Sequence, residues 1–260
     1  MSNNSYYWEN KNARAKSALA HVEDMENRYK NEIANSVNGT IVCDGSTNSE
    51  GPSDYEIELI DIDSVSAVLN ANGKTCVLNF ASYKHPGGMY LNGSRAQEEC
   101  LCHESTLYNV LKTQKKYYEY NNSNLNRSMY FNRGLYSPDI IFERDGNIKK
   151  ADVLTCAAPN FSAASKYGLI DAKANSRYIR SRIEFLLSHL SDKDLDTIIL
   201  GAFGCGVFGQ DPTEVATIFL DTIPKVFHSN KKTKFVFAVI DANSNNYEAF
   251  NKVINNRKEK

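Results

Sequence analysis

Two segments of the chain hold residues whose types and spacing are suited to chemistry. In the first, residues 77–111, the paired glycines Gly87 and Gly88 are followed by two adjacent carboxylates, Glu98 and Glu99. Paired glycines let the backbone approach a ligand closely because no Cβ stands in the way, and carboxylates are common general acids and bases. Neighbouring helical residues point about 100° apart. We therefore expect one carboxylate to act on the reacting atom and the other to position it.

The surroundings of the two carboxylates allow two interpretations. Ser94, with Gln97 three residues later, has the spacing of a capping box and predicts a helix that begins just before Glu98 and Glu99, with Ser94 as its N-cap. A helix dipole lowers the pKa of a carboxyl group at the helix start, which favours an ionised, structural glutamate. A general acid needs a raised pKa, which burial or an anionic substrate would supply. Both interpretations stay open on these residues alone.

The second segment, residues 197–220, combines glycines with a helix start. An apolar run leads into a loop with four glycines in nine residues: Gly201, Gly204, Gly206 and Gly209. A helix is expected next, with Asp211 as its N-cap, Pro212 at its first position and Glu214 completing a capping box. Glycines ahead of a helix N-terminus expose successive backbone N–H groups, which can hold a phosphate or diphosphate without lysine or arginine. The segment therefore predicts a phosphate-binding loop.

Two familiar phosphate motifs fit this loop poorly. A P-loop has lysine and then serine or threonine after its last glycine, whereas Gln210 and Asp211 follow the last glycine here. The glycines of residues 204–209 do have GxGxxG spacing. However, one clear strand follows them, and Asp241 at its end lies farther on than the ~20 residues usual in a dinucleotide site. Nucleotide hydrolysis of the P-loop kind and a Rossmann dehydrogenase are therefore disfavoured.

The six cysteines are best explained as structural thiols. Cys205, inside the glycine-rich loop, would need a base to act as a nucleophile, and His85 would have to approach it in space because no histidine is close in sequence. Cys100, Cys102 and His103 are neighbours, but helical positions i and i+2 point apart, which argues against a zinc site. No CxxC pair is present. We expect reduced, buried or half-buried thiols, with Cys205 a small residue beside the phosphate.

The composition excludes several classes of function. The chain has 260 residues, of which 42% are apolar and 23% charged, as in a folded globular protein. Lys and Arg number 30 against 31 Asp and Glu, and without a cluster of cations, non-specific nucleic-acid binding is not expected. No apolar run approaches the ~20 residues that span a bilayer, and residues 1–16 lack the apolar core of a signal peptide. We expect no membrane association and a cytoplasmic location.

The elements that must position these residues alternate along the chain. An amphipathic helix is expected over residues 6–35. Short apolar runs predict strands at residues 40–43, 55–62, 75–81, 129–131, 151–157, 197–202 and 235–240. Helical patterns lie between them at residues 64–71, 95–112, 171–190, 213–227 and 247–254. Polar tracts predict surface loops or helix ends at residues 44–53 and 117–126. The alternation indicates one α/β domain whose strands are covered on both faces.

The two chemical segments together resemble the macrodomain superfamily, and within it the microbial-type poly(ADP-ribose) glycohydrolases. The signature of that family is a glycine triplet followed by Gln-Glu-Glu, and this chain has Gly-Gly-Met at residues 87–89 followed by Gln-Glu-Glu at residues 97–99. The stretch GAFGCGVFG, residues 201–209, is similar to the family's diphosphate-binding loop. The resemblance covers most of the chain, including the N-terminal helix that precedes the macrodomain core in the microbial branch.

The resemblance implies a fold and an activity. The fold is a three-layer α/β/α macrodomain with a mixed central sheet, in a single domain over residues 1–260, of which about 1–36 form an N-terminal helical extension. The activity is hydrolysis of ribosyl O-glycosidic bonds in poly(ADP-ribose), which releases ADP-ribose and requires no metal or cofactor. The substrate would be ADP-ribose in the form of poly(ADP-ribose) or ADP-ribosylated macromolecules.

Carried over position by position, the resemblance also implies roles for individual residues. Glu99 would be the catalytic acid and base, and Glu98 would hold the distal ribose or the leaving group. Phe208 would shape the distal ribose pocket. The residues implied to bind ADP-ribose are Gly87, Gly88, Asn92 and Gln97 on one side, and Gly204, Cys205, Gly206, Val207 and Phe208 on the diphosphate side.

This chain departs from the family pattern at one position, and it leaves open which residue binds adenine. Met89 replaces the third glycine of the triplet, and its side chain would narrow the approach to the diphosphate or the distal ribose. Either Asp61 or Asp63, near the end of an early strand, is expected to accept a hydrogen bond from the adenine amino group. Three other functions stay open: a macrodomain that binds ADP-ribose without turnover, a hydrolase of mono-ADP-ribose on protein or nucleobase, and, last, an NAD-dependent oxidoreductase.

Overall fold

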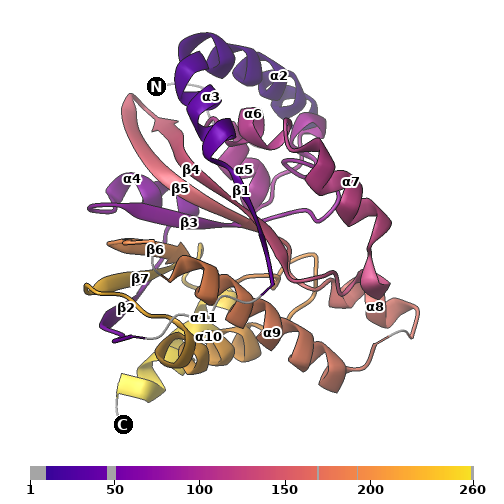
Figure 1. The fold of residues 1–260 in the computed structure, drawn as a ribbon. Helices are drawn as coiled ribbons and strands as arrows, with labels where there is room; N and C mark the ends of the chain where they lie inside the picture. The colour runs from indigo at the N-terminus through magenta and orange to yellow at the C-terminus, as the bar shows by residue number, and fades with distance from the viewer. Residues whose placement is uncertain (1–9, 46–50, 169, 192, 259–260) are drawn as a thin grey trace.

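The fold is built on one mixed sheet, seen in the computed structural model, which describes residues 10–45, 51–168, 170–191 and 193–258 (Figure 1). Its seven strands lie in the order β1-β4-β5-β3-β6-β7-β2. The strands β5, β3, β6, β7 and β2 run parallel, β4 runs antiparallel to β5, and β1 runs antiparallel to β4. The bounds are Ile41–Asp44 (β1), Tyr55–Ile60 (β2), Thr75–Phe80 (β3), Arg133–Arg144 (β4), Asn147–Cys156 (β5), Thr197–Leu200 (β6) and Thr233–Ala238 (β7).

Helices cover both faces of this sheet, which confirms the three-layer α/β/α architecture (Figure 1). One face carries α2 (Lys11–Arg28), α3 (Lys30–Gly39), α4 (Ser64–Asn70), α5 (Gln97–His103), α6 (Leu107–Leu111) and α7 (Lys115–Ser123). The other face carries α9 (Ala172–Leu190), α10 (Pro212–Val226) and α11 (Asn245–Lys258). Three short helices lie in connections: η1 (Tyr90–Asn92), η2 (Asn126–Ser128) and α8 (Phe161–Lys166).

The apolar strands explain why two helical layers form. Neighbouring residues of a strand point to opposite faces, and both faces of β3 are buried: Leu78 belongs to the core under α9 and α10, and Val77 to the core under α5 and α6. In β6, Ile198 and Ile199 divide in the same way. A strand with apolar side chains on both faces can bury them only when helices cover both sides of the sheet.

The N-terminal helical region differs from the single helix predicted over residues 6–35. It forms two helices, α2 and α3, which break at Tyr29, where the backbone leaves the helical region at φ −124° and ψ 31°. Residues 6–9 of the predicted helix lie outside the described residues. The hydroxyl of Tyr29 donates a hydrogen bond to Glu143 of β4 at 2.9 Å. The break therefore lies where the helical region is joined to the sheet.

The middle of the chain shows the largest departures from the predicted elements. The helix predicted over residues 95–112 is divided into α5 and α6, because Ser105 between them forms a β-bridge with Phe142 of β4. The strand β4 itself was not predicted, since Pro138 and Asp139 interrupt its apolar pattern at an irregularity in the pairing with β5. A strand predicted at residues 129–131 is wrong, because Tyr130 has a left-handed φ of 58°.

One other prediction fails because of burial, and the last helix is confirmed but longer than predicted. Most of the tract 117–126, predicted as loops or helix ends, belongs to α7, because Tyr117 and Tyr118 are buried in the core on that face of the sheet. The last helix, predicted over residues 247–254, extends over Asn245–Lys258. The helix α8 was not predicted. The remaining predicted strands and helices are confirmed, with shifts of a few residues at their ends.

The parallel strands gather the chemical segments at one edge of the sheet. Because β2, β7, β6, β3 and β5 run in the same direction, the connections that follow them share the carboxyl edge. Residues 81–96 follow β3 and residues 201–211 follow the adjacent strand β6. The carboxyl edge of a parallel sheet is the usual place for ligand binding in open α/β folds. The topology therefore brings together two segments that are about a hundred residues apart in sequence.

Arg144, the last residue of β4, joins three elements. Its guanidinium donates to both carboxylate oxygens of Asp63, the N-cap of α4, at 2.9 Å each, and to Glu104, which ends α5. The side chain of Arg144 is 27% exposed, so these bonds are only partly screened by water. The network fixes the entry to α4 against the end of α5.

We expect Arg144→Met to lower the free energy of unfolding by about 2 kcal/mol, because it leaves two carboxylates without their shared donor. The matched control is Arg28→Met, which removes a more exposed arginine, also bonded to two carboxylates, and should cost less than about 1 kcal/mol. Urea unfolding followed by far-UV circular dichroism measures both. Equal losses in the two variants would contradict a special role of Arg144.

Candidate active site

The turn at Gly87 and Gly88 lies directly against the two carboxylates. Both glycines have left-handed backbones, with φ of 66° and 60°. A Cβ on Gly88 would lie 2.5 Å from Oε1 of Glu99 and 2.9 Å from Oε2 of Glu98. A Cβ on Gly87 would lie 2.7 Å from the ring of Tyr108. Glycine is therefore required at residue 88 both for its conformation and for the approach of the carboxylates.

Glu99 is held by two backbone N–H groups. Its Oε1 accepts from Met89 and its Oε2 from Ala96, each at 2.9 Å, and the side chain is 6% exposed. The bond to Ala96 is one half of a capping box, since Ala96 is the N-cap of α5 and Glu99 its third residue. The prediction of Ser94 as N-cap is wrong, because the N–H of Ser94 closes the preceding turn by donating to the carbonyl of Met89.

Glu98 is the more deeply buried carboxyl group, at 3% exposure. Its Oε1 accepts from Nδ2 of Asn79 at 3.2 Å and its Oε2 from the N–H of Ser82 at 2.7 Å. Burial raises the pKa of Glu98 to about 8, and the charge of Glu99 adds to the rise, while the bonds from Ser82 and Asn79 oppose it. Glu98 is therefore largely a neutral acid at pH 7, so the two adjacent carboxyl groups need not both be charged in one buried site.

Gln97 connects the helix that bears the carboxylates to the strand beneath it. Its Oε1 accepts from the N–H of Phe80 at 2.8 Å, and its Nε2 donates to the carbonyl of Leu78 and to Oγ of Ser64. These partners lie on β3 and α4. The side chain of Gln97 thus fixes α5 at the carboxyl end of β3 and leaves Glu98 and Glu99 in place above the strand.

Met89 and Asn92 lie on the outer side of the turn. Met89 has φ −108°, which any L-residue adopts, so the backbone does not require the glycine that the family pattern has there. Its N–H is the donor to Glu99, and its side chain is 47% exposed. Asn92 ends η1 and is exposed. The residue whose Cβ would reach the carboxylates is Gly88, and Met89 lies one position beyond it.

The glycine-rich loop after β6 presents backbone donors at the neighbouring strand end. Among the described residues, no backbone carbonyl accepts from the N–H groups of Gly206, Val207 or Phe208. Gly206 and Val207 are exposed, Val207 to 82%. Gly204 and Cys205 precede them in a turn closed by the N–H of Cys205 on the carbonyl of Ala202. Three successive unpaired N–H groups at a strand end form a site for an anion.

Buried contacts fix the shape of this loop. Gln210 and Asn175 exchange two side-chain hydrogen bonds at 2.9 and 3.0 Å, and Gln210 also donates to the carbonyl of Pro159 at 2.7 Å. Both side chains are 3% exposed. Gly204 and Gly209 have φ of 78° and 70°, with no room for a Cβ at either position. The loop is therefore shaped before any ligand binds.

The helix after the loop begins as predicted, with one exception. Asp211 is the N-cap of α10, Pro212 is its first residue, and the carboxylate of Asp211 accepts from the N–H of Glu214 at 2.7 Å. Glu214 does not complete a capping box. Its carboxylate instead accepts a hydrogen bond from Oγ of Ser176 on α9.

Phe208 belongs to a row of three aromatic rings. Its ring is edge-on to Tyr130, with centroids 6.2 Å apart, and Tyr130 is stacked on Tyr83 at 4.2 Å and 9°. Tyr83 follows Ser82, whose N–H binds Glu98. Tyr83 and Tyr130 are buried, whereas Phe208 is half-buried. The row thus runs from the carboxylate side of the site to the glycine-rich loop.

Cys205 is a structural thiol. Burial raises its pKa to about 12, so the reactive thiolate is scarce at neutral pH. Its Sγ lies 3.7 Å from the carbonyl of Phe203, and no hydrogen bond joins it to His85 within the described residues. The six cysteines are free thiols, four of them buried and two half-buried, as predicted: Cys43, Cys76, Cys102 and Cys156, then Cys100 and Cys205.

Of the two aspartates considered for adenine, Asp63 is already fully engaged. Its carboxylate caps α4 through the N–H groups of Val65 and Ser66 and is paired with Arg144, which lowers its pKa to about 2 against the effect of its burial. Asp61 is exposed, and one of its oxygens accepts from the N–H of Ala242 at 3.0 Å. Asp61 is therefore the one with an oxygen to offer a ligand.

The described residues contain no group of three or more His, Cys, Asp or Glu side chains placed to hold one metal ion. None of their helices combines the length and the apolar character needed to cross a membrane.

Comparison with known proteins agrees with this geometry. The family model described as microbial-type PARG, catalytic domain, matches residues 5–145, which is more than half of the chain and includes Gly87, Gly88, Glu98 and Glu99. This chain belongs to the microbial-type PARG family. PARG stands for poly(ADP-ribose) glycohydrolase. A search among curated proteins returned no match.

Solved PARG structures match nearly the whole chain. The enzyme from Thermomonospora curvata bound to the inhibitor ADP-HPD is 28% identical, with a TM-score of 0.80, and the match covers 93% of this chain and 99% of that one. The enzyme from Deinococcus radiodurans in complex with ADP-ribose is 26% identical, with a TM-score of 0.74, and the match covers 86% and 97%. The macrodomain-like PARG fold expected from the sequence is therefore confirmed.

Several residues of the site were not found from the sequence. Asn79 and Ser82 hold Glu98, Gln210 and Asn175 hold the glycine-rich loop, and Tyr130 supports Phe208. A polar Asn79 inside the apolar run of β3 was the one visible signal, because a buried amide needs a partner. The others depend on contacts between distant segments, which no local pattern shows.

The contact at Gly88 predicts a large penalty for a single methyl group. Gly146 has a similar φ of 79° but nothing within 4 Å of its Cβ position, so Gly146→Ala measures the conformational cost alone, about 1 kcal/mol. Gly88→Ala adds a clash with two carboxylates and should lose about 2 kcal/mol more. Urea unfolding of both variants tests this prediction. Equal losses in the free energy of unfolding would show that the two carboxylates move away from the added methyl group at no cost.

The raised pKa of Glu98 predicts a dependence of stability on pH. A folded-state pKa of about 8 against 4.5 means that folding binds a proton between these values, so the contribution of Glu98 is complete below pH 4.5 and is lost as pH rises towards 8. The slope is about 1 kcal/mol per pH unit. His21, His103 and His189 titrate with lowered pKa values and contribute in the opposite sense.

The comparison of wild type with Glu98→Gln separates these effects. The free energy of unfolding, measured in urea at pH 5, 6, 7 and 8, should fall less with rising pH in the variant, and the difference between the two curves should have the slope given above. Parallel curves would mean that Glu98 is ionised throughout and would contradict its burial as a neutral acid.

Proposed function

We propose that this chain hydrolyses the ribose–ribose O-glycosidic bonds of poly(ADP-ribose) and releases ADP-ribose, with Glu99 as its acid and base. Family membership and the solved relatives bound to ADP-ribose or ADP-HPD support this activity. The observation that carries it is the turn at Gly88, whose Cα lies against both Glu98 and Glu99 at the carboxyl edge of the sheet. A ligand on this turn therefore lies above a buried carboxyl pair.

The diphosphate of ADP-ribose is assigned to the glycine-rich loop. The unpaired N–H groups of Gly206, Val207 and Phe208 supply donors for its oxygens, and the positive end of α10 follows the loop. Gly204 and Cys205 shape the approach to these donors. The strands β6 and β3 are adjacent, so a diphosphate on this loop places the distal ribose towards residues 87–89. Asp61 is the assigned partner of the adenine amino group.

Glu99 is assigned the proton transfers. As an acid it protonates the departing ribose oxygen, and as a carboxylate it then removes a proton from the water that attacks the anomeric carbon. The two N–H groups of Met89 and Ala96 hold both of its oxygens in fixed positions. One carboxylate carries both proton transfers and no second carboxylate acts as base or nucleophile, whereas most glycosidases use two carboxylates ~5 to 9.5 Å apart.

Glu98 is assigned a positioning role beside Glu99. Its burial keeps it largely protonated near neutral pH, so it can donate a hydrogen bond to a ribose oxygen and adds no second negative charge next to the diphosphate. Asn79 and Ser82 fix its orientation from below. Glu99 therefore transfers protons and Glu98 positions the ribose, in agreement with their different environments.

We further propose that residues 1–260 act as one domain, with residues 1–36 as a helical extension that supports the site. Nε of Arg14 on α2 donates to the carbonyl of Gly93 at 2.8 Å, and the hydroxyl of Tyr90 donates to the carbonyl of Ala18 at 3.2 Å. These bonds tie the extension to η1, directly after the turn at Gly88. The free, buried thiols support a reducing, cytoplasmic location.

The decisive variant is Glu99→Gln. It should reduce the release of ADP-ribose from poly(ADP-ribose) by about 10² to 10⁴-fold, because an amide cannot transfer the proton. Binding of free ADP-ribose, measured by calorimetry, should change little. The matched control is Glu119→Gln, an exposed glutamate on α7, which should keep full activity. Near-normal turnover by Glu99→Gln would show that another residue carries the proton.

A further inference from the structure

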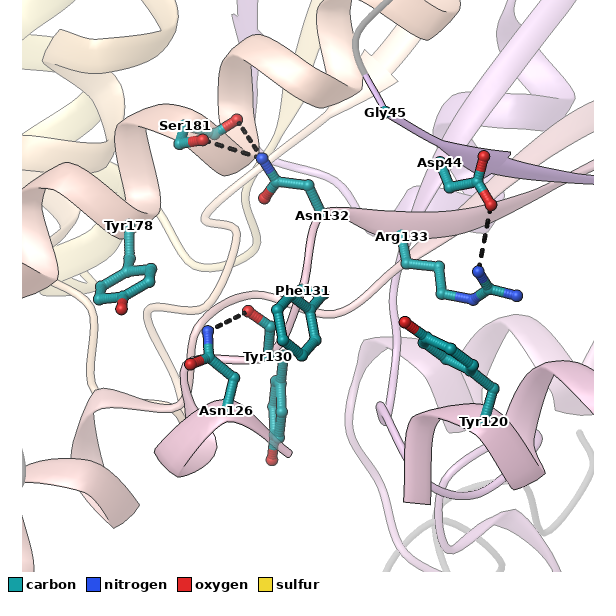
Figure 2. A pocket seen from close by; sticks show the side chains of 10 residues that line it. All are labelled: Asp44, Gly45, Tyr120, Asn126, Tyr130, Phe131, Asn132, Arg133, Tyr178 and Ser181. Atoms are coloured by element: carbon teal, nitrogen blue, oxygen red, sulfur yellow. Dashed lines mark hydrogen bonds and ion pairs between the residues drawn. The ribbon is translucent and has the colours of Figure 1, made fainter. Parts of the chain in front are cut away.

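A hollow lined in part by Tyr130 is not explained by the proposed function. It is a cavity of about 490 Å³, within the range of ligand pockets in proteins. Figure 2 shows Tyr178 on one side of this space, Tyr120 and Arg133 on the other, and Phe131 between them. Phe131 and Tyr120 are each 45% exposed, which is unusual for large aromatic side chains.

The cavity meets the active site at Tyr130. This residue lines the cavity, is edge-on to Phe208 of the glycine-rich loop, and is stacked on Tyr83 on the carboxylate side. Phe131 follows Tyr130 directly in the chain. The part of a long substrate that extends out of the active site past Phe208 and Tyr130 would therefore reach the ring of Phe131.

The polar groups of the cavity are few and include an unused donor. Arg133 lies over the ring of Tyr120 at 4.2 Å and pairs with Asp44 at 3.2 Å. Its Nε is buried and has no hydrogen-bond partner among the described residues. Nδ2 of Asn132 donates to Ser181. Aromatic faces with a few oriented polar groups are the usual lining of a site for a flat heteroaromatic ring.

The wall of the cavity is held in place by a buried arginine. The segment before Phe131 contains four residues with left-handed backbones: Asn126, Arg127, Ser128 and Tyr130. Arg182, 1% exposed, donates to the carbonyls of Met129 and Ala157 and to Oδ1 of Asn132.

We propose that this cavity binds the adenine of the leaving unit of poly(ADP-ribose), stacked on Phe131 and Tyr178. In the polymer, the bond that is broken joins the distal ribose of one unit to the adenosine ribose of the next. The leaving group therefore carries a purine one ribose away from the scissile bond, and its phosphates follow. This inference rests on the proposed function and deepens it, since it assigns a site to the second unit of the substrate.

The test compares binding of ADP-ribose with binding of its two-unit oligomer. Calorimetry uses the Glu99→Gln protein, so that the oligomer is not cleaved. The oligomer should bind about 10-fold more tightly than ADP-ribose, and Phe131→Ala with Tyr178→Ala should remove this advantage without changing the affinity for ADP-ribose. Phe131→Trp, which keeps a stacking surface, should retain the advantage. The control is Ile148→Ala, an exposed apolar residue at the start of β5, which should change neither affinity.

The outcomes separate the two proposals. If ADP-ribose binds but the oligomer has no advantage, or if the advantage survives the double substitution, the cavity does not hold the leaving unit and the proposed function stands. If ADP-ribose itself does not bind, the proposed function fails and the inference fails with it. If the double substitution weakens ADP-ribose and oligomer equally, the cavity residues serve the first site, which also overturns the inference.

Discussion

The site depends on the contact between a glycine backbone and two buried carboxyl groups. Gly88 comes so close to Glu98 and Glu99 that a Cβ would lie 2.9 and 2.5 Å from their oxygens. The turn is left-handed, the next N–H binds Glu99, and the helix start behind it binds the other oxygen of the same carboxylate. The turn and the helix therefore fix each other's position, and the backbone at Gly88 is packed against the two carboxyl groups to which the proposed function assigns the chemistry.

This arrangement requires the two carboxyl groups to differ. Two adjacent, buried negative charges repel each other and lose their hydration, and an anionic diphosphate would add to the repulsion. The structure resolves the conflict by burying Glu98 more deeply, which raises its pKa to about 8, and by giving Glu99 two backbone donors. The glycine-rich loop has unpaired N–H groups that can hold an anion without lysine or arginine, which fits a chain with a net charge of -1.

The elements and the helix cap that were predicted correctly are those marked by a local sequence pattern. The apolar runs predicted six of the strands, and Asp211 was correctly predicted as a helix cap. The roles of Glu99 and Glu98 came from the resemblance, whereas the phosphate-binding role of the loop came from its glycines and the helix start that follows them; all three stay predictions. Contacts between distant segments were missed: β4 is interrupted by Pro138, and the β-bridge at Ser105 divides a helix that looked continuous. The spacing of Ser94 and Gln97 predicted a capping box two residues too early, because the N-cap is Ala96, whose side chain cannot accept a hydrogen bond, and Glu99 supplies the one side-chain bond of the box.

The most direct test of the account is a crystal structure of Glu99→Gln in complex with the two-unit oligomer of ADP-ribose. We predict that the diphosphate accepts hydrogen bonds from the N–H groups of Gly206, Val207 and Phe208, and that the glycosidic oxygen lies within hydrogen-bond distance of residue 99. A diphosphate bound away from the loop, or a scissile bond out of reach of residue 99, would contradict the account.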